Sequence, residues 1–315
     1  MNSLKEANKE IKKDIKNFFR TIKYIHNVSG KFYTVIFFDM LWCMIRYGTT
    51  DNEYRIFEFY NVKSSLRKTY MCKRQYKRIT NKYVDNDVLK IVNNKDVFYT
   101  KFKKYIGRKI LNIDELSFKE FEEFALKNKI LLASNTKNFM SSYKSYDLKD
   151  FRSPAFMADK IKKDNLTFVE KRIDQNKLLN EIDDFIIVSI CSLYKRKKTH
   201  IITSTLKFRN ENGIVSGFIE PYAGTIKGSL RDDLGIPVTS KYDGKKIPLY
   251  DKILSTVEDL SKELEEVGQI EWNFAIGNKK IYLLGANVWD DYVFTQIQEY
   301  LDDKTGLMEL YKNII

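Results

Sequence analysis

Hydrophobic positions recur in the first part of the chain at the spacing of a helix. Ile11, Ile15, Phe18, Ile22 and Ile25 are separated by four or three residues. Apolar residues at this spacing fall on one face of an α-helix. The pattern therefore predicts an amphipathic helix over residues 3–25.

Other helices are marked by residues at their ends. Gly48 suits the C-cap of the helix that precedes it. Ser117 is followed three residues later by Glu120, which is the spacing of a capping box and predicts a helix over residues 117–128. Apolar residues at helical spacing predict a further amphipathic helix over residues 249–268.

After residue 128 the hydrophobic period shifts toward two, which is typical of β-strands. We expect strands over residues 129–134, 166–173, 185–194, 200–208, 270–277 and 280–288. The expected fold class is α+β. Its expected parts are a helical basic N-terminal region (1–115), a small α+β subdomain (116–180) and a larger antiparallel-sheet subdomain (181–315).

Charge is unevenly distributed along the 315 residues, whose formal net charge is +13. Residues 1–110 hold 25 Lys and Arg against 10 Asp and Glu, whereas the remainder holds 30 against 32. A basic third joined to a near-neutral remainder indicates an anionic partner, such as nucleic acid, anionic lipid or a charged glycan. A solvated basic face is the alternative.

The residue inventory excludes several kinds of site. Two histidines, His26 and His200, are too few for a histidine-rich metal site, and the sequence holds no G-x-S-x-G, Walker A or G-x-G-x-x-G motif. The inventory leaves two options for a functional site: catalysis by carboxylates and lysines, or binding without catalysis. Three widely separated cysteines indicate a reducing cytoplasm rather than a disulfide framework.

The N-terminus lacks the apolar segment of a signal peptide. The most apolar run, residues 32–45, is too short to span a bilayer and contains Asp39. We expect a buried helix there, with docking against a membrane as the alternative. The expected location is cytoplasmic, with peripheral attachment at the inner membrane as a further option.

Several stretches carry a family resemblance. They are "RYGTTDNEYRIFEFYNVKSSLRKTYM" (46–71), "LTFVEKRIDQ" (166–175), "HIITSTLKFRN" (200–210) and "EWNFAIGNKKIYLLGANVWDDY" (271–292). Their order resembles the sugar-transfer-associated ATP-grasp family, which includes teichuronopeptide-type proteins of surface-polysaccharide gene clusters. The resemblance implies an ATP-grasp-like fold with two α+β subdomains, ATP and Mg²⁺ as cofactors, and ligase chemistry.

The resemblance also implies roles for individual residues. Lys207 and Arg209 match catalytic positions. Asn273, Asn287 and Glu271 match, or lie beside, the metal-binding positions. The implied cofactor-binding residues are Lys129, Lys137, Glu170, Lys171 and Ile173.

The chain departs from the family at several of these positions. The segment 133–145, where the family has a glycine-rich flap, contains no glycine. Asn273 and Gly285 stand where the family has Asp and Glu, and only Asn287 keeps the family's identity. Fewer carboxylates weaken Mg²⁺ binding, so ATP and Mg²⁺ could have been lost. A shifted site that uses Glu271 with Asp290 is the alternative.

Two functions follow from the resemblance. The first is an ATP-dependent carboxylate–amine ligase of surface-polysaccharide or capsule biosynthesis with a remodelled site. The second is a pseudoenzyme, a catalytically inactive scaffold that binds an anionic glycan, a membrane surface or a partner enzyme. The expected partners are an anionic glycan or lipid-linked sugar, the membrane surface and a glycosyltransferase; nucleic acid is not expected.

Overall fold

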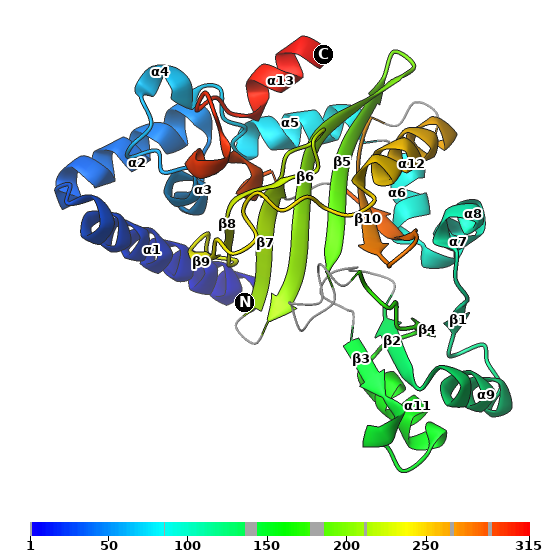
Figure 1. The fold of residues 1–315 in the computed structure, drawn as a ribbon. Helices are drawn as coiled ribbons and strands as arrows, with labels where there is room; N and C mark the ends of the chain where they lie inside the picture. Colours follow the sequence, from blue (N-terminus) through cyan, green and yellow to red (C-terminus); the bar gives the residue numbers. More distant parts are fainter. Residues whose placement is uncertain are drawn as a thin grey trace. The chain divides into compact units, whose positions relative to one another are not determined.

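The computed structural model describes residues 2–84, 86–135, 144–176, 186–210, 213–264, 268–288 and 292–315. It confirms the α+β fold class, with antiparallel sheets and helices (Figure 1). The chain divides into two compact units. Unit 1 comprises Met1–Tyr83, Gly213–Lys245 and Asp290–Ile315, and unit 2 comprises Val84–Asn212 and Lys246–Trp289. The boundaries expected after residues 115 and 180 stay predictions.

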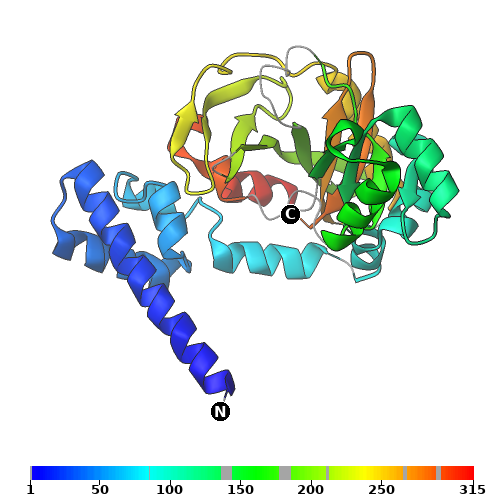
Figure 2. The same cartoon turned by 90° about the horizontal axis from the view of Figure 1, so that it is seen from below.

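Unit 1 begins with helices and is completed by three strands and the C-terminal segment. Its helices are α1 (Asn2–Ser29), α2 (Tyr33–Tyr47), α3 (Asp51–Ile56), α4 (Ser64–Arg67), α5 (Lys73–Tyr83) and α13 (Leu307–Ile314). Its strands are β7 (Gly213–Ile219), β8 (Ile226–Arg231) and β9 (Pro237–Thr239), in the order β7-β8-β9. Helices α1 and α2 pack side by side (Figure 2).

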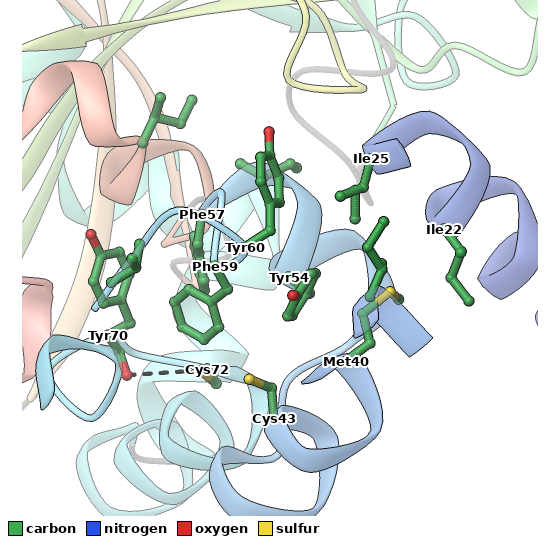
Figure 3. Close-up of a cluster of buried hydrophobic side chains, with 14 of the residues drawn as sticks. Ile22, Ile25, Met40, Cys43, Tyr54, Phe57, Phe59, Tyr60, Tyr70 and Cys72 are labelled. Atoms are coloured by element: carbon green, nitrogen blue, oxygen red, sulfur yellow. Dashed lines mark hydrogen bonds between the residues drawn. The ribbon is translucent and has the colours of Figure 1, made fainter. Parts of the chain in front are cut away.

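The core of unit 1 is a cluster of aromatic side chains beside two cysteines (Figure 3). Phe57, Phe59 and Tyr70 are fully buried, and their ring centroids lie 5.1–5.4 Å apart. Such ring pairs add to the stabilisation that burial of apolar surface provides. The cluster joins α1 and α2 to the segment that follows α3.

A partly buried ion pair secures α2 against this core. The Arg67 guanidinium donates to both carboxylate oxygens of Asp39, at 2.7 and 2.9 Å, and also to the carbonyl oxygens of Val62 and Phe59. The bidentate geometry is the strongest form of an arginine–carboxylate pair. Asp39 is thus an inward-facing anchor of α2.

The C-terminal segment binds back onto the early part of unit 1. The Tyr292 hydroxyl donates to the Glu53 carboxylate at 2.6 Å. The Gln296 side chain accepts from the backbone N–H of Met71 at 2.7 Å and donates to its carbonyl at 3.0 Å. Residues separated by 225 positions along the chain therefore form one hydrogen-bonded contact.

Unit 2 contains two groups of antiparallel strands. β1 (Ile110–Asn112), β2 (Ile130–Ser134), β3 (Lys144–Asp147) and β4 (Phe168–Lys171) form a sheet in the order β1-β4-β2-β3. β5 (Ile187–Lys195), β6 (Lys198–Asn210), β10 (Gln269–Ile276) and β11 (Ile281–Asn287) lie in the order β11-β10-β5-β6. The helices are α6 (Asn86–Asn93), α7 (Lys95–Lys101), α8 (Lys103–Ile106), α9 (Phe118–Asn128), α11 (Pro154–Lys163) and α12 (Tyr250–Glu263).

The helices of unit 2 cover its sheets. Helix α12 packs on β5 and β6 (Figure 1), and α9 packs on β2 and α11. Phe121, Ala125 and Met157 from α9 and α11 meet Leu131 and Val169 of the small sheet in one buried cluster. The small sheet is therefore held by its own apolar core.

Most expected elements are confirmed. The expectation of a buried helix at residues 32–45 is wrong in one respect: the helix forms as α2, but only Ile36, Met40 and Cys43 of its residues are buried. Thr50 and Ser117 each form a capping box, and Gly48 ends α2 in the left-handed conformation that glycine favours. The strands β3, β7, β8 and β9 were not expected. No helix within the described ranges is both long and apolar enough to cross a lipid bilayer.

We expect Arg67→Met to lower the free energy of unfolding by about 3 kcal/mol, because it leaves Asp39 without its guanidinium in a largely buried position. Urea unfolding provides the measurement. Arg78→Met, the same chemical change on an exposed residue of α5, is the control and should change the value by less than about 0.5 kcal/mol. Equal losses in the two variants would contradict the role of the pair.

The Glu53 carboxyl should make unit 1 sensitive to pH. Burial raises its pKa above 4.5, and the hydrogen bond from Tyr292 opposes that effect. A raised pKa in the folded state gives a contribution that is complete below pH 4.5 and is lost as pH rises through the raised value. The free energy of unfolding of Glu53→Gln and of the unmodified chain should be measured across this pH window. We expect the stability of the variant relative to the unmodified chain to rise with pH. A difference between the two chains that does not change with pH would refute the assignment.

Candidate functional site

A lysine and a glutamate form a fully enclosed ion pair in unit 2. The Lys207 ammonium, on β6, lies 3.0 Å from the Glu271 carboxylate, on β10, and the two side chains are only 5% and 2% exposed. An isolated charge at such a place would be strongly destabilising. Each group therefore supplies the countercharge that allows the other to be buried.

Two asparagines and a serine extend this pair into a network. Ser189 donates to Asn273 at 2.6 Å, Asn273 donates to Asn287 at 2.5 Å, and Asn287 donates to Glu271 at 3.2 Å. In the antiparallel register Glu271 stands opposite Asn287, and Asn273 stands opposite Ser189. Alternate residues of a strand share a face, so β10 presents both Glu271 and Asn273 to the network.

The structure thus brings together four of the residues singled out in the sequence. Hydrogen bonds connect the three expected metal ligands, Glu271, Asn273 and Asn287. Lys207 contacts the Glu271 carboxylate as well. Every donor in this chain of hydrogen bonds is directed toward Glu271. The result is a connected polar network rather than an open ring of acceptors.

The donor set of this network does not fit Mg²⁺. The ion prefers an octahedral set of oxygen ligands and is usually held by one or two carboxylates. The one carboxylate in the network accepts from an ammonium and an amide, and the oxygens of Asn273 and Asn287 accept hydrogen bonds as well. Within the described residues there is no group of three His, Cys, Asp or Glu side chains that could hold a metal ion.

A second buried cluster surrounds Glu170 on β4. Its carboxylate pairs with Arg108, whose guanidinium also donates to the carbonyl oxygen of Leu283 on β11 at 2.7 Å. The Glu170 and Arg108 side chains are 2% and 7% exposed. Arg108 therefore links the small sheet to the β10–β11 hairpin through one side chain.

Lys95, at the start of α7, belongs to the same cluster. Its ammonium donates to the Ser134 hydroxyl and lies 5.7 Å from the ring centroid of Tyr99 and 5.0 Å from that of Phe168. Burial lowers its pKa to about 7, Glu170 acts in the opposite direction, and Arg108 lowers the pKa further. A lysine in this state can exchange its proton near neutral pH.

Two pockets adjoin the cluster. One, of about 520 Å³, is lined by Arg108, Lys171, Ile173, Lys280 and Tyr282 together with residues of α9. The other, of about 560 Å³, is lined by Arg108, Tyr99 and Phe168 among others. Volumes of this size suit small-molecule ligands. Two of the expected cofactor-binding residues, Lys171 and Ile173, thus line a pocket.

The remaining expected residues lie elsewhere. Lys129 is the exposed C-cap of α9, with φ of 60°, and it lines neither pocket. Arg209 is exposed near the end of β6. Lys137, most of the glycine-free segment 133–145 and Asp290 lie outside the described residues.

Sequence reasoning missed Lys95 and Arg108. Both stand among many other basic residues of the segment 84–110, and no motif separates them from exposed neighbours. The one local signal is Asn94, which caps α7 and fixes where Lys95 begins the helix. Their importance arises from contacts with Ser134 and Glu170, which lie 39 and 62 positions away.

Comparisons by sequence identify no relative: no protein-family model matches the chain, and no curated protein is similar to it. Comparisons by structure find similar folds. They include a D-alanyl-alanine synthetase A from Vibrio cholerae (TM-score 0.42, 11% identity), which matches over 67% of this chain and 59% of that one. They also include the ADP complex of an N5-carboxyaminoimidazole ribonucleotide synthetase (TM-score 0.46, 14% identity), over 72% and 52% respectively.

A third similar structure is the ATP-grasp ligase PsnB with a minimal precursor (TM-score 0.43, 9% identity), over 73% of this chain and 63% of that chain. The present chain thus spans between 52% and 63% of the length of these three structures.

Proposed function

We propose that unit 2 is an ATP-grasp-like nucleotide-binding scaffold in which the Lys207 ammonium takes the place of a divalent cation. The observation that carries the proposal is the network in which Lys207, Asn287 and Asn273 all contribute to neutralising or solvating Glu271. A cation is already supplied by the protein itself. The resemblance of roughly residues 46–300 to sugar-transfer-associated ATP-grasp proteins supports the choice of ligand and suggests a role in surface-polysaccharide biosynthesis.

The pocket beside Lys171 and Ile173 has the chemistry that a nucleoside phosphate requires. Ile173 and Tyr282 supply apolar and aromatic surface for a base, while Lys171 and Lys280 supply positive charge for phosphates. Residues 171–173 form the end of β4 and its exit, and all three line this pocket. These features favour nucleotide binding without assigning a reaction.

A ligase with a remodelled site is the second candidate. It is favoured by Lys95, whose depressed pKa and contact with Ser134 place a titratable group beside Glu170. In that case ATP would phosphorylate a carboxylate and an amine would displace the phosphate, and Mg²⁺ would be needed for nucleotide binding. The two candidates differ in their dependence on the metal.

Thermal shifts with ATP or ADP should separate the candidates. We expect the nucleotide to raise the unfolding temperature of the chain equally in Mg²⁺ and in EDTA, because Lys207 already balances Glu271. Lys280→Glu reverses a charge at the pocket and should remove most of the shift, whereas Lys279→Glu, its exposed neighbour outside the pocket, should retain it.

The other outcomes are equally informative. A shift that requires Mg²⁺ and is abolished by Asn287→Ala would replace the scaffold with the ligase. Curves that no nucleotide moves would contradict both candidates.

Removal of the Lys207 ammonium should make the stability of the chain depend on an added cation. We expect Lys207→Met to lower the free energy of unfolding by about 3–5 kcal/mol, because it strands a buried carboxylate. The double variant Lys207→Met/Glu271→Gln should recover most of this loss. Added Mg²⁺ should raise the unfolding temperature of Lys207→Met more than that of the unmodified chain; an unchanged response would show that the ammonium does not substitute for a metal.

A further inference from the structure

The solvent-facing side of α2 in unit 1 is apolar from Val35 to Ile45. Val35, Phe38, Trp42 and Ile45 follow one another at steps of three, four and three residues, the spacing of one helix face. Their side chains are 54%, 66%, 58% and 64% exposed. Large apolar side chains that are exposed together usually mark an interaction site.

The polar groups of α2 do not interrupt this face. The helix contains two charged residues, Asp39 and Arg46. Asp39 is directed inward, where it pairs with Arg67 and accepts from the Tyr54 hydroxyl. Arg46 lies in the last turn, so the exposed face is apolar from Val35 to Ile45 and ends in a positive charge.

Further positive charge borders the apolar face. Arg74, at the start of α5, donates to the carbonyl oxygens of Ile45 and Arg46 at 3.1 and 3.5 Å. Helix α5 has five Lys and Arg among its 11 residues and no acidic residue. Lys73, Arg74, Lys77 and Arg78 are all exposed.

The exposed side of α1 has a related composition. Ile15 and Phe19 are 53% and 57% exposed, and the neighbouring Lys16, Arg20 and Lys23 are exposed as well. Helices α1 and α2 pack against each other within unit 1 (Figure 2). Unit 1 therefore presents aromatic and aliphatic side chains together with a basic border.

We infer that this face of unit 1 docks on an anionic lipid surface. Apolar and aromatic side chains enter the boundary between headgroups and acyl chains, and Lys and Arg attract acidic headgroups. Trp42 has the amphipathic ring that favours this boundary. The positive border distinguishes this target from an uncharged apolar partner. The inference does not depend on the nucleotide-binding proposal, because it concerns residues of unit 1 alone.

Flotation of the full chain with lipid vesicles tests the inference. We expect binding to vesicles that contain phosphatidylglycerol and at least tenfold weaker binding to pure phosphatidylcholine, because each basic residue near an anionic surface contributes about 1 kcal/mol. The variant Phe38→Ser/Trp42→Ser/Ile45→Ser should lose at least roughly tenfold in binding to the acidic vesicles, since it removes the side chains that enter the membrane.

Matched controls separate this face from general hydrophobicity. Phe118, Leu126 and Phe156, in unit 2, are 54%, 55% and 55% exposed, so Phe118→Ser/Leu126→Ser/Phe156→Ser also removes three exposed apolar side chains at another place. This control should bind like the unmodified chain. Arg74→Gln/Lys77→Gln/Arg78→Gln keeps the apolar face and should weaken binding to acidic vesicles, as should an increase in salt.

The fluorescence of Trp42 gives a readout that does not rely on a disruptive variant. Acidic vesicles should shift the emission of the chain to shorter wavelength, and Trp42→Phe should abolish the shift while binding persists. Unchanged vesicle binding by the triple serine variant would overturn the inference. Equal binding to neutral and acidic vesicles would also overturn it, as would a concentration-dependent dimer that the same variant disrupts.

Discussion

The burial of the Glu271 carboxylate is the constraint on which the candidate site depends. Its side chain is 2% exposed, so water does not solvate its charge and the protein has to do so. Lys207 balances the charge, and the amide of Asn287 donates to the same oxygen. Asn273 and Ser189 then fix the orientation of Asn287. Ser189, Lys207, Asn273 and Asn287, from β5, β6, β10 and β11, are thus arranged around one negative charge.

A carboxylate is also neutralised by a neighbouring cationic side chain at two other places. Arg108 neutralises Glu170 in unit 2, and Arg67 neutralises Asp39 in unit 1. Each cation also donates to backbone carbonyl oxygens, at Leu283 in the first case and at Val62 and Phe59 in the second. Because arginine can satisfy a carboxylate and neighbouring carbonyls together, each pair also ties separate segments of its unit to one another.

Part of this organisation could be predicted from the sequence, because it is encoded in local patterns. Alternating apolar residues predicted β5, β6, β10 and β11 nearly in full, and the capping box at Ser117 located the start of α9. Of the four strands that were not expected, β3, β8 and β9 lack that alternation: β3 is the polar stretch KSYD, β8 includes Gly228 with φ of 71°, and β9 has three residues beginning with Pro237. Pairing with neighbouring strands determines their conformation.

The candidate site also has a part that local sequence patterns predict and a part that they do not. Glu271, Asn273 and Asn287 belong to one hairpin, so strand geometry and register were sufficient to bring them together. The pairing of Lys207 with Glu271, and of Arg108 with Glu170, joins residues more than 60 positions apart. Such contacts depend on how sheets and helices pack, which no local pattern specifies. Basic residues are also so frequent in the first 110 residues that composition concealed the buried cations Lys95 and Arg108.

The hydrogen bonds of Gln296 and Tyr292 have a consequence for biosynthesis. Residues 53–71 leave the ribosome more than 200 residues before the side chains that complete their surroundings. Until then the aromatic cluster of unit 1 lacks Ile297 and Tyr300, and the Glu53 carboxylate lacks its phenol partner. Unit 2, which is encoded between these segments, can gather its own core earlier. During translation the first segment of unit 1 therefore cannot complete its core until the last segment emerges. Its apolar residues need protection from aggregation until then.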